Sequence, residues 1–328
     1  MRNSRSSAVL ATLVGIGLTS AVPAAAQRLS FERSYDVPGE ATLDVRTIRG
    51  RIDISAGETA RVIVRGTATV RVGLDVPLNA YEIAKAVAAN PPVQRDNDTI
   101  RLRPPTAEEE QRSVTISYEV TVPKGIRVIS ATDSGATSVR GVGGAVSART
   151  QSSAITLADL GGKTDVTTGS GAISINGVGG DLTVTNESSG ITLRNLGAGL
   201  RVRTQSGAVN ATFIGRGNVD VETGSSLIDL SGVNGGLAAH SNSGSIRIAG
   251  VPAAPWRVTT GSSRIELGID RNTTFTLDAK SDSSDVELEG VVVDGRTAKG
   301  VANGKVGAGG PLVQAASRSG RIRIRSER

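Results

Sequence analysis

A pair of small residues recurs along the second half of the sequence, and its spacing constrains the fold more than any other feature. The pair is Ser-Gly or Ser-Ser, and its first serine stands at positions 134, 152, 170, 188, 206, 225, 243, 262, 283 and 319. The pairs thus recur about every 18 residues, with slightly longer later steps and a last step of about twice that length. Such a period is typical of repeat proteins in which each unit stacks on the next.

Two short apolar alternations fill each period. In the stretch SGAISINGVGGDLTVTNE, Ile173 and Ile175 are followed by Leu182 and Val184. Alternation at period two gives each segment one inward and one outward face, so each segment is expected to be a strand. Glycine-rich corners such as residues 177–180 permit the positive φ of a sharp turn.

We therefore predict an all-β fold, a single-stranded β-helix or solenoid with coils of about 18 residues. Alternation of Ser-Gly with Ser-Ser also allows a coil of about 36 residues with four strands. The shorter coil is favoured because the hydrophobic register already matches after one step of the shorter period.

Charged residues at outward positions follow the same period. The position between the two inward residues reads Thr192, Asn210, Asp229, Arg247 and Glu266 in successive coils. On the second strand, Arg201 lies one coil before Asp220, and Arg203 lies one coil before Glu222. Opposite charges in adjacent rungs attract, so these residues are interpreted as structural ladders.

The regions before and after the clean repeats are less regular. We predict an N-terminal β region at residues 27–132 that caps the solenoid, and solenoid repeats at 133–328. The frame is already visible at Arg49–Ile54. A helical insertion is expected at about 76–92, because Leu78, Tyr81, Ala84 and Val87 recur every three residues before two prolines.

Two further segments interrupt the pattern. Residues 107–111 contain three glutamates in a row and are expected to form a solvated loop. A glycine-rich insertion is predicted at about 290–312, and a last strand at Ala315–Arg325.

Residues 1–26 have the pattern of a signal peptide. Arg2 and Arg5 precede an apolar core at Ala8–Leu18, and Ala24–Ala26 offers a cleavage site. The apolar core is too short to cross a bilayer as a helix, and no later apolar run suggests a transmembrane segment. We therefore expect an exported protein of the periplasm, the outer surface or the medium.

Composition argues against several kinds of function. The chain has no cysteine and one histidine, His240, so zinc and copper sites of the usual ligand types cannot be assembled. Calcium patterns such as residues 161–165 do not recur in register. The formal charge is +6, a mild excess that predicts no nucleic-acid partner. No cofactor and no catalytic centre are expected.

A polysaccharide-active enzyme is the main catalytic alternative, because many β-helices cleave polysaccharides. Such an enzyme needs two carboxylates about 5–10 Å apart beside a groove. Asp229 and Glu266 share one column, but Arg247 lies between them. Trp256 and Phe275 fall on inward positions, where they could not line a sugar-binding groove.

Three stretches occur in a recognisable order. They are SYEVTVPKGIRV (Ser117–Val128), the Ser-Gly-led coils, and the closing GKVGAGG…SRSGRIRIR. In this order they resemble the exported bacterial "putative adhesin" family of β-strand-repeat proteins, over roughly Leu43 to Arg325. The resemblance implies a right-handed β-helix-like fold and a role at the cell envelope or surface. It supplies no catalytic residues.

One charge cluster could bind a ligand. It consists of Arg318, Arg321, Arg323, Arg325 and Arg328. The cluster either protects the edge of a final strand or contacts an anionic envelope polymer or lipid headgroup. We expect a structural or adhesive protein whose partner is an envelope or surface polymer or protein. A second alternative is an envelope-stress accessory protein that binds a partner protein through its irregular N-terminal part, which a bare apolar patch near Tyr81 would favour.

Overall fold

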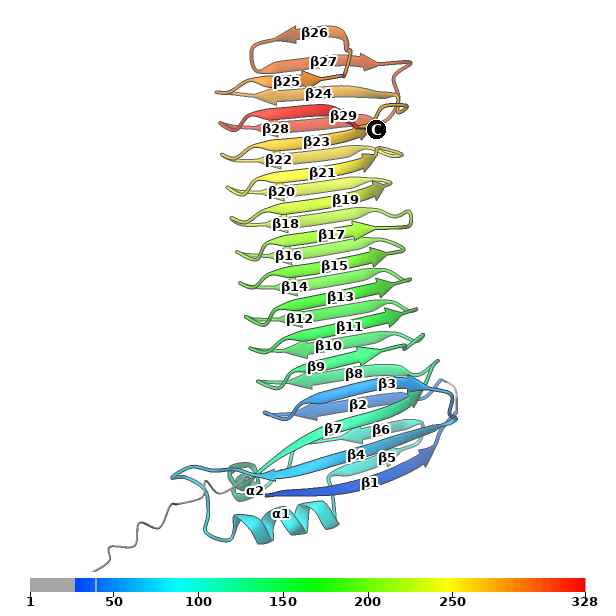
Figure 1. Ribbon diagram of the computed structural model, residues 1–328, viewed down its shortest axis with the longest axis vertical. Helices are drawn as coiled ribbons and strands as arrows, with labels where there is room; N and C mark the ends of the chain where they lie inside the picture. The colour runs from blue at the N-terminus through cyan, green and yellow to red at the C-terminus, as the bar shows by residue number, and fades with distance from the viewer. Residues whose placement is uncertain (1–26, 39, 328) are drawn as a thin grey trace, which may run out of the picture.

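The protein is a tall stack of short strands in two sheets that enclose one core (Figure 1). The computed structural model describes residues 27–38 and 40–327, so the expected signal peptide and Arg328 lie outside the described residues. Within them, the sheets contain 14 and 15 strands. The predicted all-β solenoid is confirmed.

Regular coils make up the middle of the stack, and each contributes one strand to each sheet. The first four coils contain β8 (Arg127–Thr132) and β9 (Thr137–Arg140), β10 (Val146–Thr150) and β11 (Ile155–Leu160), β12 (Thr164–Thr168) and β13 (Ile173–Val178), and β14 (Leu182–Asn186) and β15 (Ile191–Leu196). The next four contain β16 (Leu200–Thr204) and β17 (Val209–Phe213), β18 (Val219–Thr223) and β19 (Ile228–Asn234), β20 (Leu237–Ser241) and β21 (Ile246–Val251), and β22 (Trp256–Thr260) and β23 (Ile265–Asp270).

Strand pairing fixes the length of one coil. All neighbours among these strands are parallel, and Ile155 of β11 pairs with Ile173 of β13, one short period later. Leu182 of β14 pairs with Leu200 of β16 at the same separation. One coil therefore has two strands and about 18 residues, as in other stacked repeats of short units. The longer coil with four strands is excluded.

Burial follows the predicted alternation. Ile173, Ile175, Leu182 and Val184 are each at most 2% exposed, whereas Ser174 between them is exposed. Full burial of each such side chain contributes about 1.5–3 kcal/mol. The core is therefore a continuous column of aliphatic side chains that needs no disulfide.

The Ser-Gly and Ser-Ser corners interlock from coil to coil, which explains why they alternate. In a Ser-Ser corner, Ser153 Oγ donates a hydrogen bond to the carbonyl oxygen of Ser134 one coil below, at 2.5 Å. The carbonyl oxygen of Ser153 then lies under Gly171 of the next coil, 1.7 Å from where a Cβ would stand. The doubled period thus belongs to the corner packing and not to the coil itself.

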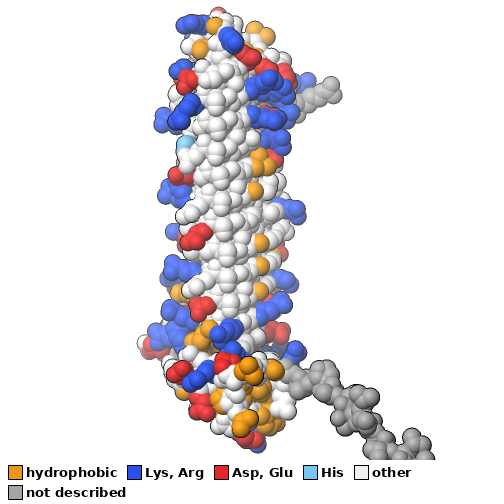
Figure 2. Space-filling view, turned by 90° about the vertical axis from the view of Figure 1, so that its left-hand side faces the viewer, with side chains coloured by type: hydrophobic (Ala, Val, Ile, Leu, Met, Phe, Trp, Pro, Cys, Tyr) orange, Lys and Arg blue, Asp and Glu red, His pale blue; other side chains and the backbone are white. Residues whose placement is uncertain are grey.

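The corners form one long edge of the stack. Figure 2 faces this edge and shows a nearly uncharged column with charged side chains on both sides. Inside most corners a buried polar side chain caps the turn, as where Thr168 Oγ1 accepts a hydrogen bond from Gly171 N at 3.0 Å. The edge is therefore narrow and mostly polar, with few charged side chains.

The first coil is placed out of chain order at the base. It consists of β2 (Thr42–Thr47) and β3 (Ile52–Gly57), which pair with β8 and β9 above them. The chain then leaves and returns as β6 (Thr99–Leu102) and β7 (Val114–Pro123), which pair with the lower side of the same coil. The prediction that the solenoid frame begins near Arg49–Ile54 is confirmed.

Antiparallel strands and two helices close the base. They are β1 (Arg28–Asp36), β4 (Arg61–Val70), α1 (Ala80–Ala89), β5 (Val93–Asp96) and α2 (Glu108–Ser113). Helix α1 lies within the segment for which a helix was expected, but its buried residues are Ala80, Ala84 and Val87. Leu78 and Tyr81, which belong to the expected three-residue pattern, are exposed. The expected loop at 107–111 is wrong, because most of it belongs to α2.

The C-terminal end also departs from chain order. It contains β24 (Phe275–Ser281), β25 (Val286–Glu289), β26 (Asp294–Ala298), β27 (Val301–Val306), β28 (Leu312–Ser317) and β29 (Ile322–Glu327). The coil of β28 and β29 lies between the coil of β22 and β23 and that of β24 and β25. The expected single last strand is therefore two strands, and the glycine-rich insertion holds an antiparallel hairpin of β26 and β27.

Candidate functional site

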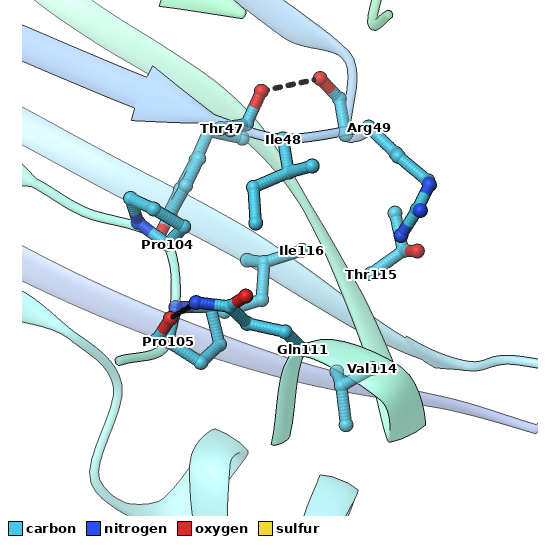
Figure 3. Close-up of a pocket in the computed structure, with 11 residues that line it drawn as sticks. Thr47, Ile48, Arg49, Pro104, Pro105, Gln111, Val114, Thr115 and Ile116 are labelled. Atoms are coloured by element: carbon cyan, nitrogen blue, oxygen red, sulfur yellow. Dashed lines mark hydrogen bonds between the residues drawn. The ribbon is translucent and has the colours of Figure 1, made fainter. Parts of the chain in front are cut away.

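An enclosed hollow lies at the base, between the corner after β2 and the region of α2 and β7 (Figure 3). Two of its polar side chains, those of Thr47 and Gln111, are already paired with backbone carbonyl oxygens. Thr47 Oγ1 donates to the carbonyl oxygen of Gly50 at 2.8 Å, and Gln111 Nε2 donates to that of Pro105 at 2.8 Å. The space open to a water-sized molecule is about 20 Å³, which holds about one water. This hollow is too small for an organic substrate.

Tyr118 lines the same hollow and is a structural residue. Its hydroxyl donates to the carbonyl oxygen of Arg103 at 3.3 Å, and its ring packs edge-on against Phe31. Burial raises the pKa of Tyr118, so its hydroxyl stays protonated at neutral pH. It is not poised to act as a base.

A column of alternating charge runs along the outer face of the 14-stranded sheet. From rung to rung it reads Asp229, Arg247, Glu266, Arg323 and Glu287. Arg247 contacts both neighbours: its Nη1 lies 3.3 Å from Asp229 Oδ2, and its Nε lies 3.1 Å from Glu266 Oε2. The predicted ladder is confirmed.

Glu266 in this column has two arginine partners, Arg247 and Arg264. Burial on its own raises the pKa of Glu266, but hydrogen bonds from Arg247 and Arg264 outweigh it and leave the pKa lowered. A general acid in glycoside hydrolysis needs a raised pKa. Glu266 and Asp229 are therefore arranged as ladder members and not as an acid and its partner.

A second ladder crosses the 15-stranded sheet. Arg203 Nε lies 3.1 Å from Glu222 Oε2, as expected for adjacent rungs, but its two terminal nitrogens also contact Asp220 at 3.0 and 2.7 Å. Arg201 lies 3.5 Å from the same Asp220 carboxylate. The two expected pairs are thus one network of four side chains.

The C-terminal arginines lie where the strand alternation places them. Ile322 and Ile324 point into the core, and the three arginines of the segment point outward. Arg321 contacts Glu287 at 3.2 Å, Arg323 contacts Glu287 at 3.1 Å and Glu289 at 3.2 Å, and Arg325 contacts Glu327 at 2.7 Å.

The edge-protection interpretation of this cluster is wrong. Strand β29 is an inner strand between β23 and β25, so its charges face neighbouring rungs. Arg318 lies on the exposed corner before β29, and no ion pair joins it to another of the described residues.

The remaining candidates are surface groups. His240 Nδ1 is 2.8 Å from Thr259 Oγ1, and its Nε2 is 3.1 Å from Asn242 Oδ1. Within residues 27–38 and 40–327, no three His, Cys, Asp or Glu side chains gather closely enough to hold a metal ion. Over the same residues no helix is both long and apolar enough to span a bilayer.

Sequence analysis did not single out Val72 and Leu74, which are exposed at the base together with Leu78 and Tyr81. A signal for them was present, because Gly73, Asp75 and Pro77 surround them with residues that favour turns. Apolar side chains in such a turn segment have no core to enter.

Comparison with known proteins gives a family but no activity. The family model described as Toastrack DUF4097 matches residues 106–325. No curated protein matches the sequence. Among solved structures, the chain is similar to a "putative cell adhesion protein" from Clostridium sporogenes, at 8% identity and a TM-score of 0.19, covering 92% of this chain and 100% of that one. A "putative adhesin" from Bacteroides fragilis has 12% identity and a TM-score of 0.27, covering 91% of this chain and 97% of that one.

Both TM-scores are too low to support an inference about this chain. The family model covers two thirds of the sequence, including all the regular coils. It agrees with the resemblance to "putative adhesin" β-repeat proteins that the sequence indicated. The chain belongs to the Toastrack DUF4097 family.

Proposed function

We propose that the protein is an exported, non-catalytic β-solenoid that binds a polymer or protein of the cell envelope through the long faces of its stack. The observation that carries the proposal is the regular outward surface, in which each rung presents side chains in register with the next. A repetitive surface favours many weak contacts in series, and these add up when the ligand is itself repetitive.

The state of the polar groups argues for binding without catalysis. The one carboxylate pair considered for glycan cleavage is bridged by Arg247. Tyr81 is the only aromatic residue among the exposed large hydrophobic side chains of the described residues. Stacking platforms for sugar rings are therefore scarce on the faces of the stack.

Export is part of the proposal and is based on the sequence of residues 1–26. It places the protein in the periplasm, on the outer surface or in the medium. An anionic ligand, if bound near the tip, would contact Arg318 first, because Arg321, Arg323 and Arg325 each have a glutamate partner.

A sedimentation assay with insoluble envelope glycan tests binding and turnover together. The mature chain, residues 27–328, should sediment with the glycan and release no new reducing ends. Arg318→Ser should weaken the retention if the corner before β29 takes part in binding. Lys299→Ser is the control, because it also removes one positive charge at the tip.

The enzymatic alternative makes the opposite prediction. Release of reducing ends that Glu266→Gln abolishes and Glu287→Gln does not would overturn the non-catalytic proposal. Both residues belong to the same charge column, so the second variant controls for damage to the ladder.

A further inference from the structure

The loop before α1 and the first turn of α1 expose four apolar side chains at the base of the molecule. Val72 is 78% exposed, Tyr81 is 42% exposed, and Leu74 and Leu78 are fully exposed. These four residues, which we call the basal surface, lie close together in the sequence. Figure 2 shows hydrophobic side chains gathering at this end of the molecule. Elsewhere the described residues expose large apolar side chains at scattered positions.

Hydrogen bonds hold the basal surface in place. Arg71 donates to the carbonyl oxygens of Arg112 and Gln111 at 3.0 and 3.4 Å, which ties the start of the loop to α2. Asn79 Nδ2 donates to Glu109 Oε1 at 3.4 Å just before α1 begins. Because α1 packs its alanine side on the sheet, Tyr81 faces away from the core.

The loop before α1, α1 itself and α2, which we call the rim, carry more acidic than basic side chains. The acids of the loop, α1 and α2 are Asp75, Glu82, Glu108, Glu109 and Glu110, and the bases are Arg71, Lys85 and Arg112. Ion pairs join Arg71 to Asp75, Lys85 to Glu82 and Arg112 to Glu108 at 3.4–4.0 Å. Two glutamates are left over, so the rim is acidic on a chain whose formal charge is +6.

This combination selects one kind of occupant. We infer that the basal surface binds a cationic amphipathic segment of another protein, whose apolar side covers the leucines and whose Lys or Arg residues face the acidic rim. An anionic membrane surface is disfavoured because the rim would repel it. A symmetric pair of copies is disfavoured because it would bring the two acidic rims together. The site is separate from the stack faces and does not depend on their proposed role.

The test uses a synthetic amphipathic helix of Leu and Lys as the probe, and the same helix with Glu in place of Lys as its control. The mature chain should bind the Lys peptide, and added salt should weaken the binding. Leu74→Ser with Leu78→Ser should lower the affinity by about a hundredfold, since burial of each Leu is worth about one factor of ten. Val292→Ser, 84% exposed near the opposite end, should leave the affinity unchanged.

A charge reversal tests the rim. Glu110→Lys, which leaves the bond between Asn79 and Glu109 intact, should shift the preference toward the Glu peptide while circular dichroism and melting stay unchanged. The proposal is overturned if all variants bind the Lys peptide equally. It is also overturned if the leucine variants lose binding to phosphatidylglycerol vesicles and keep peptide binding, or if the chain dimerises through these leucines in sedimentation equilibrium.

Discussion

The corner packing makes a sharp prediction at Gly171. An added Cβ would stand 1.7 Å from the carbonyl oxygen of Ser153 and 2.4 Å from its carbonyl carbon. Contacts of a real Cβ below 3.0 Å essentially never occur, so Gly171→Ala must push the two coils apart at this corner. The obstacle is backbone, which cannot swing away as a long side chain could.

The cost can be bounded from the bonds at the corner. Overpacking alone typically costs about 1–3 kcal/mol. Opening the corner also strains the hydrogen bonds from Gly169 N and Ser170 N to the carbonyl oxygen of Gln151, now 3.1 and 2.9 Å, each worth about 0.5–1.5 kcal/mol. We expect a loss of about 2–6 kcal/mol from these two contributions together.

Gly190→Ala is the matched control. It stands in the corner of the next coil, and no atom lies within 4 Å of its added Cβ. Its effect should stay within about 1 kcal/mol, with a stabilising sign from the stiffer unfolded chain. Urea unfolding followed by circular dichroism measures both changes. Equal losses for the two variants, or an unchanged midpoint for Gly171→Ala, would refute the explanation of the alternating corners.

Three further predictions follow from the core and the charges. Ile175→Asp should lower the melting temperature far more than Ser174→Asp, because it buries an unpaired carboxylate; similar losses would mean that the strand faces are assigned wrongly. A double-mutant cycle on Arg203 and Glu222 should give a coupling of no more than about 1 kcal/mol that salt weakens, since both side chains are partly exposed. Burial alone raises the pKa of Asp44, but two neighbouring arginines outweigh it and lower that pKa. The stability that Asp44 contributes is thus present above its ordinary value of 3.8 and is lost as the pH falls through the lower folded value. Urea titrations at several pH values should show the advantage over Asp44→Asn shrinking below about pH 4.

Most of the coil could be predicted from the sequence because each coil meets only its neighbours. The inward positions of Ile173 and Ile175 follow from alternation at period two, and the register between coils follows from the short repeat period. A one-residue slip would turn every apolar side chain toward solvent, so the pattern allows one register. Local information is sufficient where contacts repeat.

The sequence pattern did not identify the buried face of helix α1, for a different reason. The expected stripe used the large residues Leu78 and Tyr81, whereas the buried stripe consists of Ala80, Ala84 and Val87. Small residues let α1 approach the antiparallel strands β4 and β1 closely. Side-chain size therefore did not indicate which face is buried.

The contacts of the C-terminal arginines were missed because they depend on a non-local placement. Chain order alone puts β25 directly on β23, which would set Glu287 beside Glu266. In the structure β29 lies between these strands, and Arg323 pairs in register with both glutamates. The column of charge then alternates in sign without a break.

The corner residues indicate the same placement of the coil of β28 and β29. In chain order, Ser262-Ser263 is followed by Ser283-Ser284, and the alternation of Ser-Gly with Ser-Ser fails. In space, Ser319-Gly320 lies between them: Gly320 leaves room for the carbonyl oxygen of Ser263, and Ser284 Oγ donates to the carbonyl oxygen of Ser319 at 2.8 Å.

Two independent patterns, one of charge and one of corner size, are each broken along the chain and restored in the stack. Both therefore require the last coil to enter between two others, as the first coil does at the base. A coil that lies between two others cannot fray from the end of the stack. The strands at the two ends of the stack belong to the irregular base and the short tip, and this arrangement limits the addition of further coils.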